Sequence, residues 1–299
     1  MKVTKKSFMK YMIITFVISW IIEAIAIRFA SMGDLTKFRF MLVILMYVPF
    51  ISTLISGISP KGMGWLPAIK GKVRYIFIAL WLCSALMVVG AGLFFVVFRG
   101  AFDGGLDLYT RDLQASLPEG ITVDEALASQ GLTIRTLFLA QILQGLTIAP
   151  LINMFIALGE EVGWRGVMYP YLKDKYGLVR GRIAGGIIWG IWHWPIMIFA
   201  GYEYGSEYLG SPVLGPVVFC IFTTTIGILM DYVYDRTGCI WIPSLMHGSV
   251  NAFSTVFPYL LAGKYARYII LGPVPYGLIS MIPLIIAAVL IMRIGNKNR

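Results

Sequence analysis

Charge is scarce in this chain, and its scarcity decides the class of protein. Only 13% of the 299 residues are Asp, Glu, Lys or Arg, whereas 58% are hydrophobic. A soluble globular domain carries about 25% charged and about 45–50% apolar residues. The composition therefore excludes an ordinary soluble protein. It predicts an all-α, polytopic membrane protein, because helices satisfy their own backbone polar groups inside lipid.

Residues that define several familiar sites are also few. The three cysteines, Cys83, Cys220 and Cys239, have no paired spacing, so we interpret them as packing residues without a disulfide framework. The sequence has no His-Glu-x-x-His motif of the soluble metalloproteases and no Asn-x-Ser/Thr sequon. We also find no internal repeat and no low-complexity tract.

Long apolar runs are abundant, and about 20 apolar residues make one membrane span. Eight candidate spans fill the chain, so we predict one membrane domain over residues 1–299 and no soluble module. The predicted spans are 8–28, 40–58, 75–98, 134–158, 183–200, 213–234, 240–262 and 268–292. Because Ala24-Ile25-Ala26 resembles a cleavage site, a removed signal peptide is the alternative to a retained first span.

The net charge of +10 would suit a nucleic-acid-binding protein, but the basic residues cluster in short loops. Such clusters mark the cytoplasmic side of a membrane. With eight spans they fall on one side, so we predict cytoplasmic termini, a lipid bilayer as the surroundings and no nucleic-acid partner. The residues counted are Lys2, Lys5, Lys6, Lys10, Lys61, Lys70, Lys72, Arg74, Lys173, Lys175, Arg180, Arg182, Arg293, Lys297 and Arg299.

Two loops are expected on the opposite side. The long acidic loop 99–135 is interpreted as a surface lid or spacer, in which Thr122 and Glu125 resemble a capping box that begins a short helix. The acidic, aromatic residues 202–208 are interpreted as a solvated loop. Arg28, Lys37 and Arg39 also fall on this side and mildly violate the charge rule.

Polar residues gather in the second half of the chain. Gln141, Gln144 and Asn153 interrupt the span 134–158, and Pro150 predicts a bend in it. Buried amides need partners, so this helix faces either other helices or a wet cavity. Residues 160–176 are interpreted as an amphipathic helix along the cytoplasmic boundary.

A run of ionisable residues follows this span directly. Glu161 and Arg165 are four residues apart and can pair on one helical face. Glu160 then points about 100° away and is left for other work. Ionisable groups at such depth are costly unless they are paired or functional.

The only two histidines, His193 and His247, lie downstream in apolar segments. Trp189 and His193 are four residues apart, as are His247 and Asn251, so each pair shares a helical face. Either histidine alone could be a hydrogen-bonded packing residue. Together with Glu160 they predict a hydrolytic site within the bilayer, in which a carboxylate beside an apolar pocket serves as general base. Two imidazoles and a carboxylate would also suit zinc.

These residues carry a resemblance to a known family. Glu160-Glu161-x-x-x-Arg165, Trp189-x-x-x-His193 and His247-x-x-x-Asn251 resemble the three motifs of the CPBP intramembrane proteases, which include the CAAX prenyl protease 2, Abi and lysostaphin-resistance-like proteins. The family pattern has phenylalanine where this chain has Trp189. The family core would span about residues 134–262.

The resemblance implies an eight-helix endopeptidase that cleaves prenylated CAAX-type or other membrane-associated substrates. Glu160 would activate the water, and His193 would share that water or bind a metal. His247 and Asn251 would stabilise the oxyanion, with His247 a second metal ligand in the zinc alternative. Glu161 would assist at the site or be structural, and Arg165 would orient it. The family is described as metalloproteases, but a metal-free, glutamate-dependent mechanism is the alternative.

Two interpretations stay open from the sequence. The rival function is a non-catalytic immunity, scaffold or transporter-like membrane protein, in which the polar residues form a core or a solute path. The cavity of the protease interpretation is expected to open toward the cytoplasmic face. The tryptophans near the motifs are interpreted as interfacial anchors, with a substrate groove as the alternative; they are Trp164, Trp189, Trp192, Trp194 and Trp241.

Overall fold

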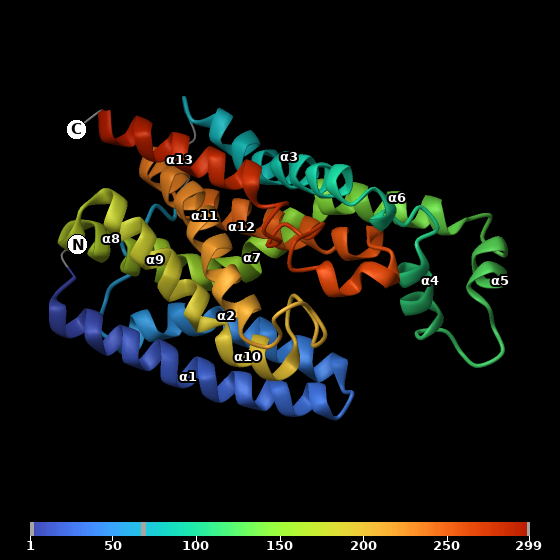
Figure 1. Cartoon of the computed structure of the whole chain (residues 1–299). Coiled ribbons are helices and arrows are strands. Elements are labelled where there is room, and N and C mark those ends of the chain that lie inside the picture. Colours follow the sequence, from blue (N-terminus) through green and yellow to red (C-terminus); the bar gives the residue numbers. More distant parts are fainter. Residues whose placement is uncertain (1–2, 67–69, 298–299) are drawn as a thin grey trace.

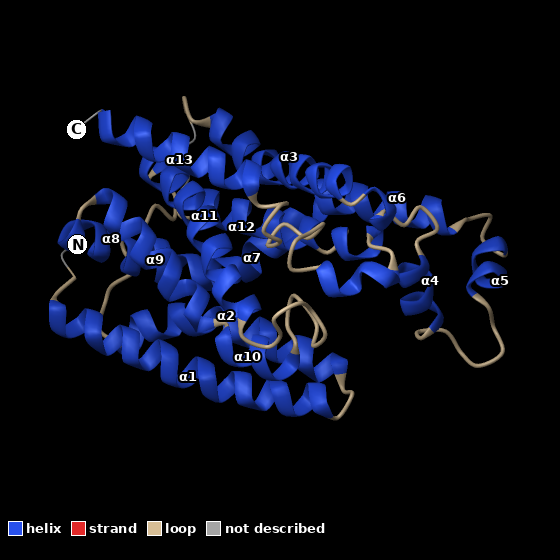
Figure 2. Cartoon of the chain, in the orientation of Figure 1, coloured by secondary structure: helices blue, strands red, loops and turns tan. Residues whose placement is uncertain are grey.

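The computed structural model describes residues 3–66 and 70–297. Within these ranges the chain folds into helices without a β-strand, and one isolated bridge joins Phe102 to Leu261 (Figure 2). The predicted all-α membrane class is confirmed. Lys2 and Arg299, which entered the charge pattern, lie outside the described residues.

The described helices include five that are long and apolar enough to cross a membrane, or six if one bent pair is counted as a span. The predicted number of eight is therefore not confirmed. The long helices are α1 (Lys5–Ser31), α2 (Leu35–Ile55), α3 (Val73–Val97), α9 (Leu178–Trp192) with α10 (Trp194–Ala200), and α11 (Leu214–Thr237). The bent pair is α6 (Ile134–Leu146) with α7 (Ile148–Gly163), and the shorter helices are α4 (Asp107–Gln114), α5 (Val123–Ala128), α8 (Tyr169–Tyr176), α12 (Trp241–Ser254) and α13 (Ile282–Lys297).

The last two predicted spans are shorter in the structure than in the prediction. Helix α12 ends at Ser254 rather than near residue 262, and a 3₁₀ turn with a proline follows at Phe257–Leu260. Residues 268–281 are not part of an α-helix, and α13 begins only at Ile282. The stretch Gly272-Pro-Val-Pro-Tyr-Gly277 explains this, because proline lacks the N–H that a helix needs and glycine weakens helix interiors.

The bend predicted from Pro150 is present. Helix α6 and the segment Ile148–Tyr176, which begins with α7 and ends with α8, are bent by 49° on either side of Thr147. Pro150 has no N–H for the carbonyl of Leu146, one turn earlier. That carbonyl instead accepts a hydrogen bond from the indole of Trp81 on α3, at 3.1 Å. The bend therefore fixes α6 against α3 and leaves α7 to run into the bundle.

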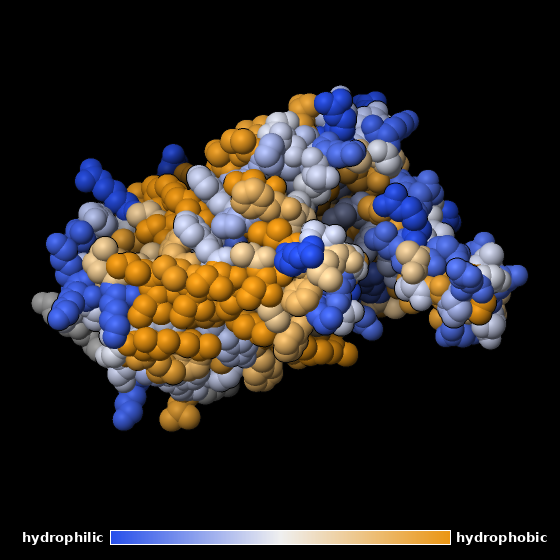
Figure 3. All heavy atoms as spheres, turned by 90° about the horizontal axis from the view of Figure 1, so that it is seen from below, coloured by the Kyte–Doolittle hydropathy of each residue, from blue (hydrophilic) through white to orange (hydrophobic). Residues whose placement is uncertain are grey.

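The helices form one elongated bundle. Helix α1 begins and α13 ends at the same end, whereas α4 and α5 project from the opposite end (Figure 1). A broad apolar band covers the face below the bundle, with hydrophilic residues at both ends (Figure 3). On α1, the exposed members of this band include Met9, Ile13, Val17, Trp20, Ile21 and Ile25. This surface belongs to an integral, multi-pass membrane protein, and the cytoplasmic position of the termini stays a prediction.

Four charged side chains join α8, α9 and α11 near the end that holds the termini. Lys173 contacts Asp231 at 2.8 Å and Asp235 at 2.6 Å, while Arg182 contacts the same two carboxylates at 2.6 and 3.0 Å. Asp231 is fully buried and Arg182 is nearly so. Two residues counted only as topology signals therefore also hold α8 and α9 onto α11, which carries part of the site.

Candidate active site

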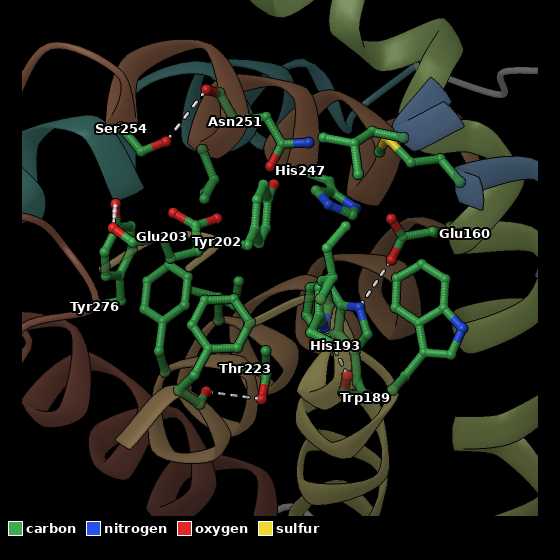
Figure 4. Close-up of a pocket in the computed structure, with 18 of the residues that line it drawn as sticks. Glu160, Trp189, His193, Tyr202, Glu203, Thr223, His247, Asn251, Ser254 and Tyr276 are labelled. Atoms are coloured by element: carbon green, nitrogen blue, oxygen red, sulfur yellow. Dashed lines mark hydrogen bonds between the residues drawn. The ribbon is translucent and has the colours of Figure 1, made fainter. Parts of the chain in front are cut away.

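A cavity of about 80 Å³ lies inside the bundle where α2, α7, α9, α11 and α12 meet. Its volume is enough for a few waters. Figure 4 shows Glu160, His193, His247 and Asn251 around it, together with Glu203 from the loop after α10. Four of the six predicted site residues therefore face one cavity. Glu161 and Arg165 lie behind them.

Glu160 presents one carboxylate oxygen to this cavity. Its other oxygen, Oε2, accepts hydrogen bonds from the indole of Trp164 at 2.9 Å and from the indole of Trp189 at 2.8 Å. The residue itself is only 3% exposed. Two donors on Oε2 fix the carboxylate and leave Oε1 to accept a proton from a water in the cavity.

Glu161 points away from Glu160, as the helical spacing predicts, and pairs with Arg165. Its Oε1 accepts from Arg165 Nη1 at 2.8 Å and from His247 Nδ1 at 2.8 Å. The fully buried guanidinium of Arg165 lies over the rings of Tyr169 and Trp189, with its central carbon 4.8 and 4.6 Å from the two ring centroids. This chain of contacts orients His247 from behind, so Glu161 and Arg165 are positioning residues.

Both histidines have one ring nitrogen engaged and one left over. His193 Nδ1 lies 2.9 Å from the carbonyl oxygen of Trp189, and His247 Nδ1 faces the carboxylate of Glu161. Because both oxygens can only accept, each Nδ1 carries the hydrogen. A neutral imidazole then has a lone pair on Nε2, which can bind water, and a charged one has an N–H there.

His193 lies at a break in its helix. Helix α9 ends at Trp192, and α10 begins at Trp194 with Pro195 in its first turn. The backbone N–H of Ile196 has no helical partner at that position, and it donates to Glu23 Oε2 on α1 at 3.1 Å. The fully buried Glu23 therefore caps α10 and holds the break in place. Sequence reasoning missed it, although a single carboxylate inside the first apolar run was the available signal.

The segment after Glu160 lies in the interior, which corrects the prediction of a boundary helix over residues 160–176. Residues 160–169 are almost all buried, and Trp164–Met168 form a π-helical turn. Gly159 permits this depth, because a Cβ there would collide with the backbone of Met46 and Tyr47 on α2. Such π-turns are frequent at functional sites.

Three of the five tryptophans are not interfacial anchors. Trp164, Trp189 and Trp192 are at most 2% exposed, and Trp189 and Trp192 line the cavity. The prediction of anchoring is wrong for these three, because their indoles pack inside the bundle, where two of them bind Glu160. The family pattern has phenylalanine where this chain has Trp189. This difference affects the site, because phenylalanine has no N–H to donate to Glu160.

The loop after α10 is also not the solvated loop that its composition predicts. Tyr202 and Glu203 line the cavity, while Tyr204 and Tyr208 are buried. Hydrogen bonds to distant parts of the chain hold it: Tyr204 donates its hydroxyl to the Tyr276 carbonyl at 2.7 Å. The burial of this loop depends on contacts between residues that are far apart in the sequence, so its composition alone could not predict that burial.

The half-buried part of the cavity wall lies toward the end of the bundle opposite the termini. It includes Glu203 in the loop after α10 and Ser254 at the end of α12 (Figure 1).

The sequence predicts Glu160, His193 and His247 as possible metal ligands. Within residues 3–66 and 70–297, no three His, Cys, Asp or Glu side chains are grouped closely enough to hold a metal ion. Glu160, His193 and His247 line one cavity without forming such a group. As arranged, this donor set does not fit zinc, and no chemical step is derived through a metal.

Comparison with known proteins gives two matches. The family model described as type II CAAX prenyl endopeptidase Rce1-like matches residues 142–253. The protein CAAX prenyl protease 2 of Methanococcus maripaludis is 26% identical over 117 residues, which is 39% of this chain. The chain spans 40% of the length of that relative. The range of the family model contains all three motifs.

Proposed function

We propose that this chain, whose residues 142–253 match the type II CAAX prenyl endopeptidase Rce1-like family model, is an intramembrane endopeptidase of the CPBP family in which Glu160 activates water. One observation carries this proposal. Glu160 Oε1 and the Nε2 atoms of His193 and His247 are the unengaged atoms of three side chains that line a single buried cavity.

The reaction follows from these free atoms. A water held by His193 Nε2 gives a proton to Glu160 Oε1 as its oxygen attacks the carbonyl carbon of the scissile peptide bond. The tetrahedral oxyanion accepts hydrogen bonds from the Asn251 amide and from His247 Nε2–H, whose positive charge the Glu161 carboxylate stabilises. Glu160 then passes its proton to the leaving nitrogen as the C–N bond breaks. The products are a carboxylate and an amine.

The substrate class follows from the surroundings of the site. The cavity is lined by residues of α2, α9 and α11, which belong to segments long and apolar enough to cross a membrane, so its substrate is a membrane-associated peptide, either lipidated or membrane-embedded. Prenylated CAAX proteins are one candidate substrate, because the relative is named CAAX prenyl protease 2.

Peptide hydrolysis by purified protein in liposomes tests the proposal. The substrates are internally quenched peptides with a farnesyl group, an acyl chain or an apolar helix as anchor. Glu160→Gln should abolish cleavage, while the exposed control Glu119→Gln should retain it. Wild-type protein that cleaves no peptide of this panel would contradict the proposal. Full activity of Glu160→Gln would also contradict it and would favour the non-catalytic membrane function.

A further inference from the structure

Glu203 is a second carboxylate in the wall of the catalytic cavity, and the three motifs do not account for it. It belongs to the loop between α10 and α11. In Figure 4 its side chain lies across the cavity from Glu160, with Tyr202 between them. A substrate that places its scissile bond at Glu160 must therefore pass Glu203 with a neighbouring residue.

The backbone at Glu203 is strained and held in place. Its φ angle is +73°, in the left-handed region that non-glycine residues seldom adopt. Two tyrosines fix this conformation, because Tyr276 donates its hydroxyl to the Glu203 carbonyl at 3.0 Å and Tyr204 donates to the Tyr276 carbonyl at 2.7 Å. Strain that the surroundings enforce at a cavity wall is a mark of a functional position.

Carboxylates outnumber cationic groups in the cavity wall, where His247 is the one side chain that becomes positively charged in the proposed step. The described lining contains the carboxylates of Glu160 and Glu203 and neither lysine nor arginine. The nearest guanidinium, that of Arg165, is fully buried behind the wall and paired with Glu161. Such a wall attracts a cationic group and repels an anionic one, and this preference is strongest where water is scarce.

From this arrangement we infer that Glu203 is a specificity residue that selects a positively charged substrate residue beside the scissile bond and disfavours a free carboxylate there. The preferred substrate is then a membrane-anchored peptide with Lys, Arg or a free amine a few residues from the cleaved bond. This inference rests on the proposed peptidase activity and narrows its substrate class: it disfavours CAAX-type peptides, which end in a free carboxylate close to the cleaved bond, and favours anchored peptides with a cationic group there.

A lysine scan tests the inference. One internally quenched, membrane-anchored peptide with neutral residues around the cleaved bond is compared with variants that carry Lys at each of the three positions on either side. A second pair differs only in a free or amidated C-terminus. We expect one Lys position to raise kcat/KM by about tenfold, and we expect the amide to be preferred over the free acid.

Glu203→Gln should remove both preferences, so that its kcat/KM is the same for the Lys, neutral, free-acid and amidated peptides, and measurable cleavage of the neutral peptide shows that the variant is folded. Glu203→Lys should reverse them. Glu207→Gln, an exposed carboxylate in the same loop, is the matched control and should keep them.

The results distinguish failure of the role of Glu203 from failure of the proposed peptidase activity. Equal cleavage of Lys and neutral peptides by wild type, or an unchanged preference in Glu203→Gln, overturns the role of Glu203 and leaves the peptidase standing. Failure of wild type to cleave any peptide overturns the proposed activity, and the inference falls with it.

Discussion

The indole of Trp189 donates a hydrogen bond to Glu160 Oε2 across 2.8 Å, and the ring of the same tryptophan lies under the guanidinium of Arg165. One side chain thus contacts the proposed general base and the cation that orients Glu161. The related family pattern has phenylalanine at this position, which could fill the space but could not donate.

Trp189→Phe should therefore lower kcat by about tenfold, because a charge-assisted hydrogen bond to the base is lost. KM should change little, since the substrate need not touch the indole N–H. Steady-state kinetics on the panel of anchored peptides measures both constants. Trp194→Phe is the control, because its indole donates to the Pro216 carbonyl outside the site. An unchanged kcat in Trp189→Phe would show that the hydrogen bond does not support catalysis.

The ion network between α8, α9 and α11 should be essential for stability. Asp231→Ala leaves the partly buried Lys173 and the buried Arg182 with only the half-exposed Asp235 as a partner. Breaking a buried pair in this way costs about 3–5 kcal/mol. Thermal unfolding in detergent should show a clear fall in Tm for Asp231→Ala and none for Asp174→Asn, an exposed neighbour of Lys173. Equal Tm values would mean that the network adds no net stability.

The sequence predicts contacts between residues that are close together in the chain, and it predicts contacts between remote residues poorly. The Glu161–Arg165 pair and the Thr122–Glu125 capping box were predicted correctly, because both are contacts between residues three or four apart. The grouping of Glu160 with His193 and His247 needed the resemblance to a family, since spacing alone left each histidine ambiguous.

Contacts between remote segments account for most of what the sequence did not predict. Glu203 looks like a loop residue until Tyr276, more than seventy positions away, fixes it at the cavity wall. The sequence analysis counts Lys173 and Arg182 as loop charges, because the sequence does not show that Asp231 lies beside them. The end of α12 at Ser254 was missed for a local reason, because apolar composition hid the effect of the prolines that follow.

The preference for a cationic substrate should depend on pH. Burial raises the pKa of Glu203 to about 7, although hydrogen bonds from Tyr276 and Tyr202 oppose this rise. The carboxyl is neutral below that pKa and charged above it, so the preference for Lys over Gln should grow from about pH 6 to about pH 8.

The other titratable groups that face Glu203 or share its cavity are Tyr202, Tyr276, Glu160, His193 and His247. The charge of Glu203 and burial raise the pKa of Tyr202, and burial and that charge raise the pKa of Tyr276, so both phenols stay neutral in this range. Titration of the catalytic groups changes the rates of both peptides, and any part of it that changes their ratio is also present in Glu203→Gln. In Glu203→Gln the ratio should be independent of pH, and a ratio that still rises would assign the effect to another group.

Removal of metal ions should leave the activity in place. The described His, Cys, Asp and Glu residues form no three-ligand group, and the proposed step uses only Glu160 and the two histidines. Protein dialysed against a strong chelator, with its zinc content measured by mass spectrometry, should keep kcat within about twofold. Loss of activity that returns on adding stoichiometric zinc would replace the general-base step with a metal-bound water.

The central claim is that Glu160 activates water and does not attack the peptide itself. Single-turnover cleavage in H₂¹⁸O, followed by mass spectrometry of the product and of the Glu160-containing fragment of the enzyme, tests this directly. We predict one ¹⁸O atom in the new carboxylate of the product and none in Glu160, because the attacking oxygen comes from the water in the cavity. Labelled Glu160 would show an acyl intermediate on its carboxylate and would contradict the account.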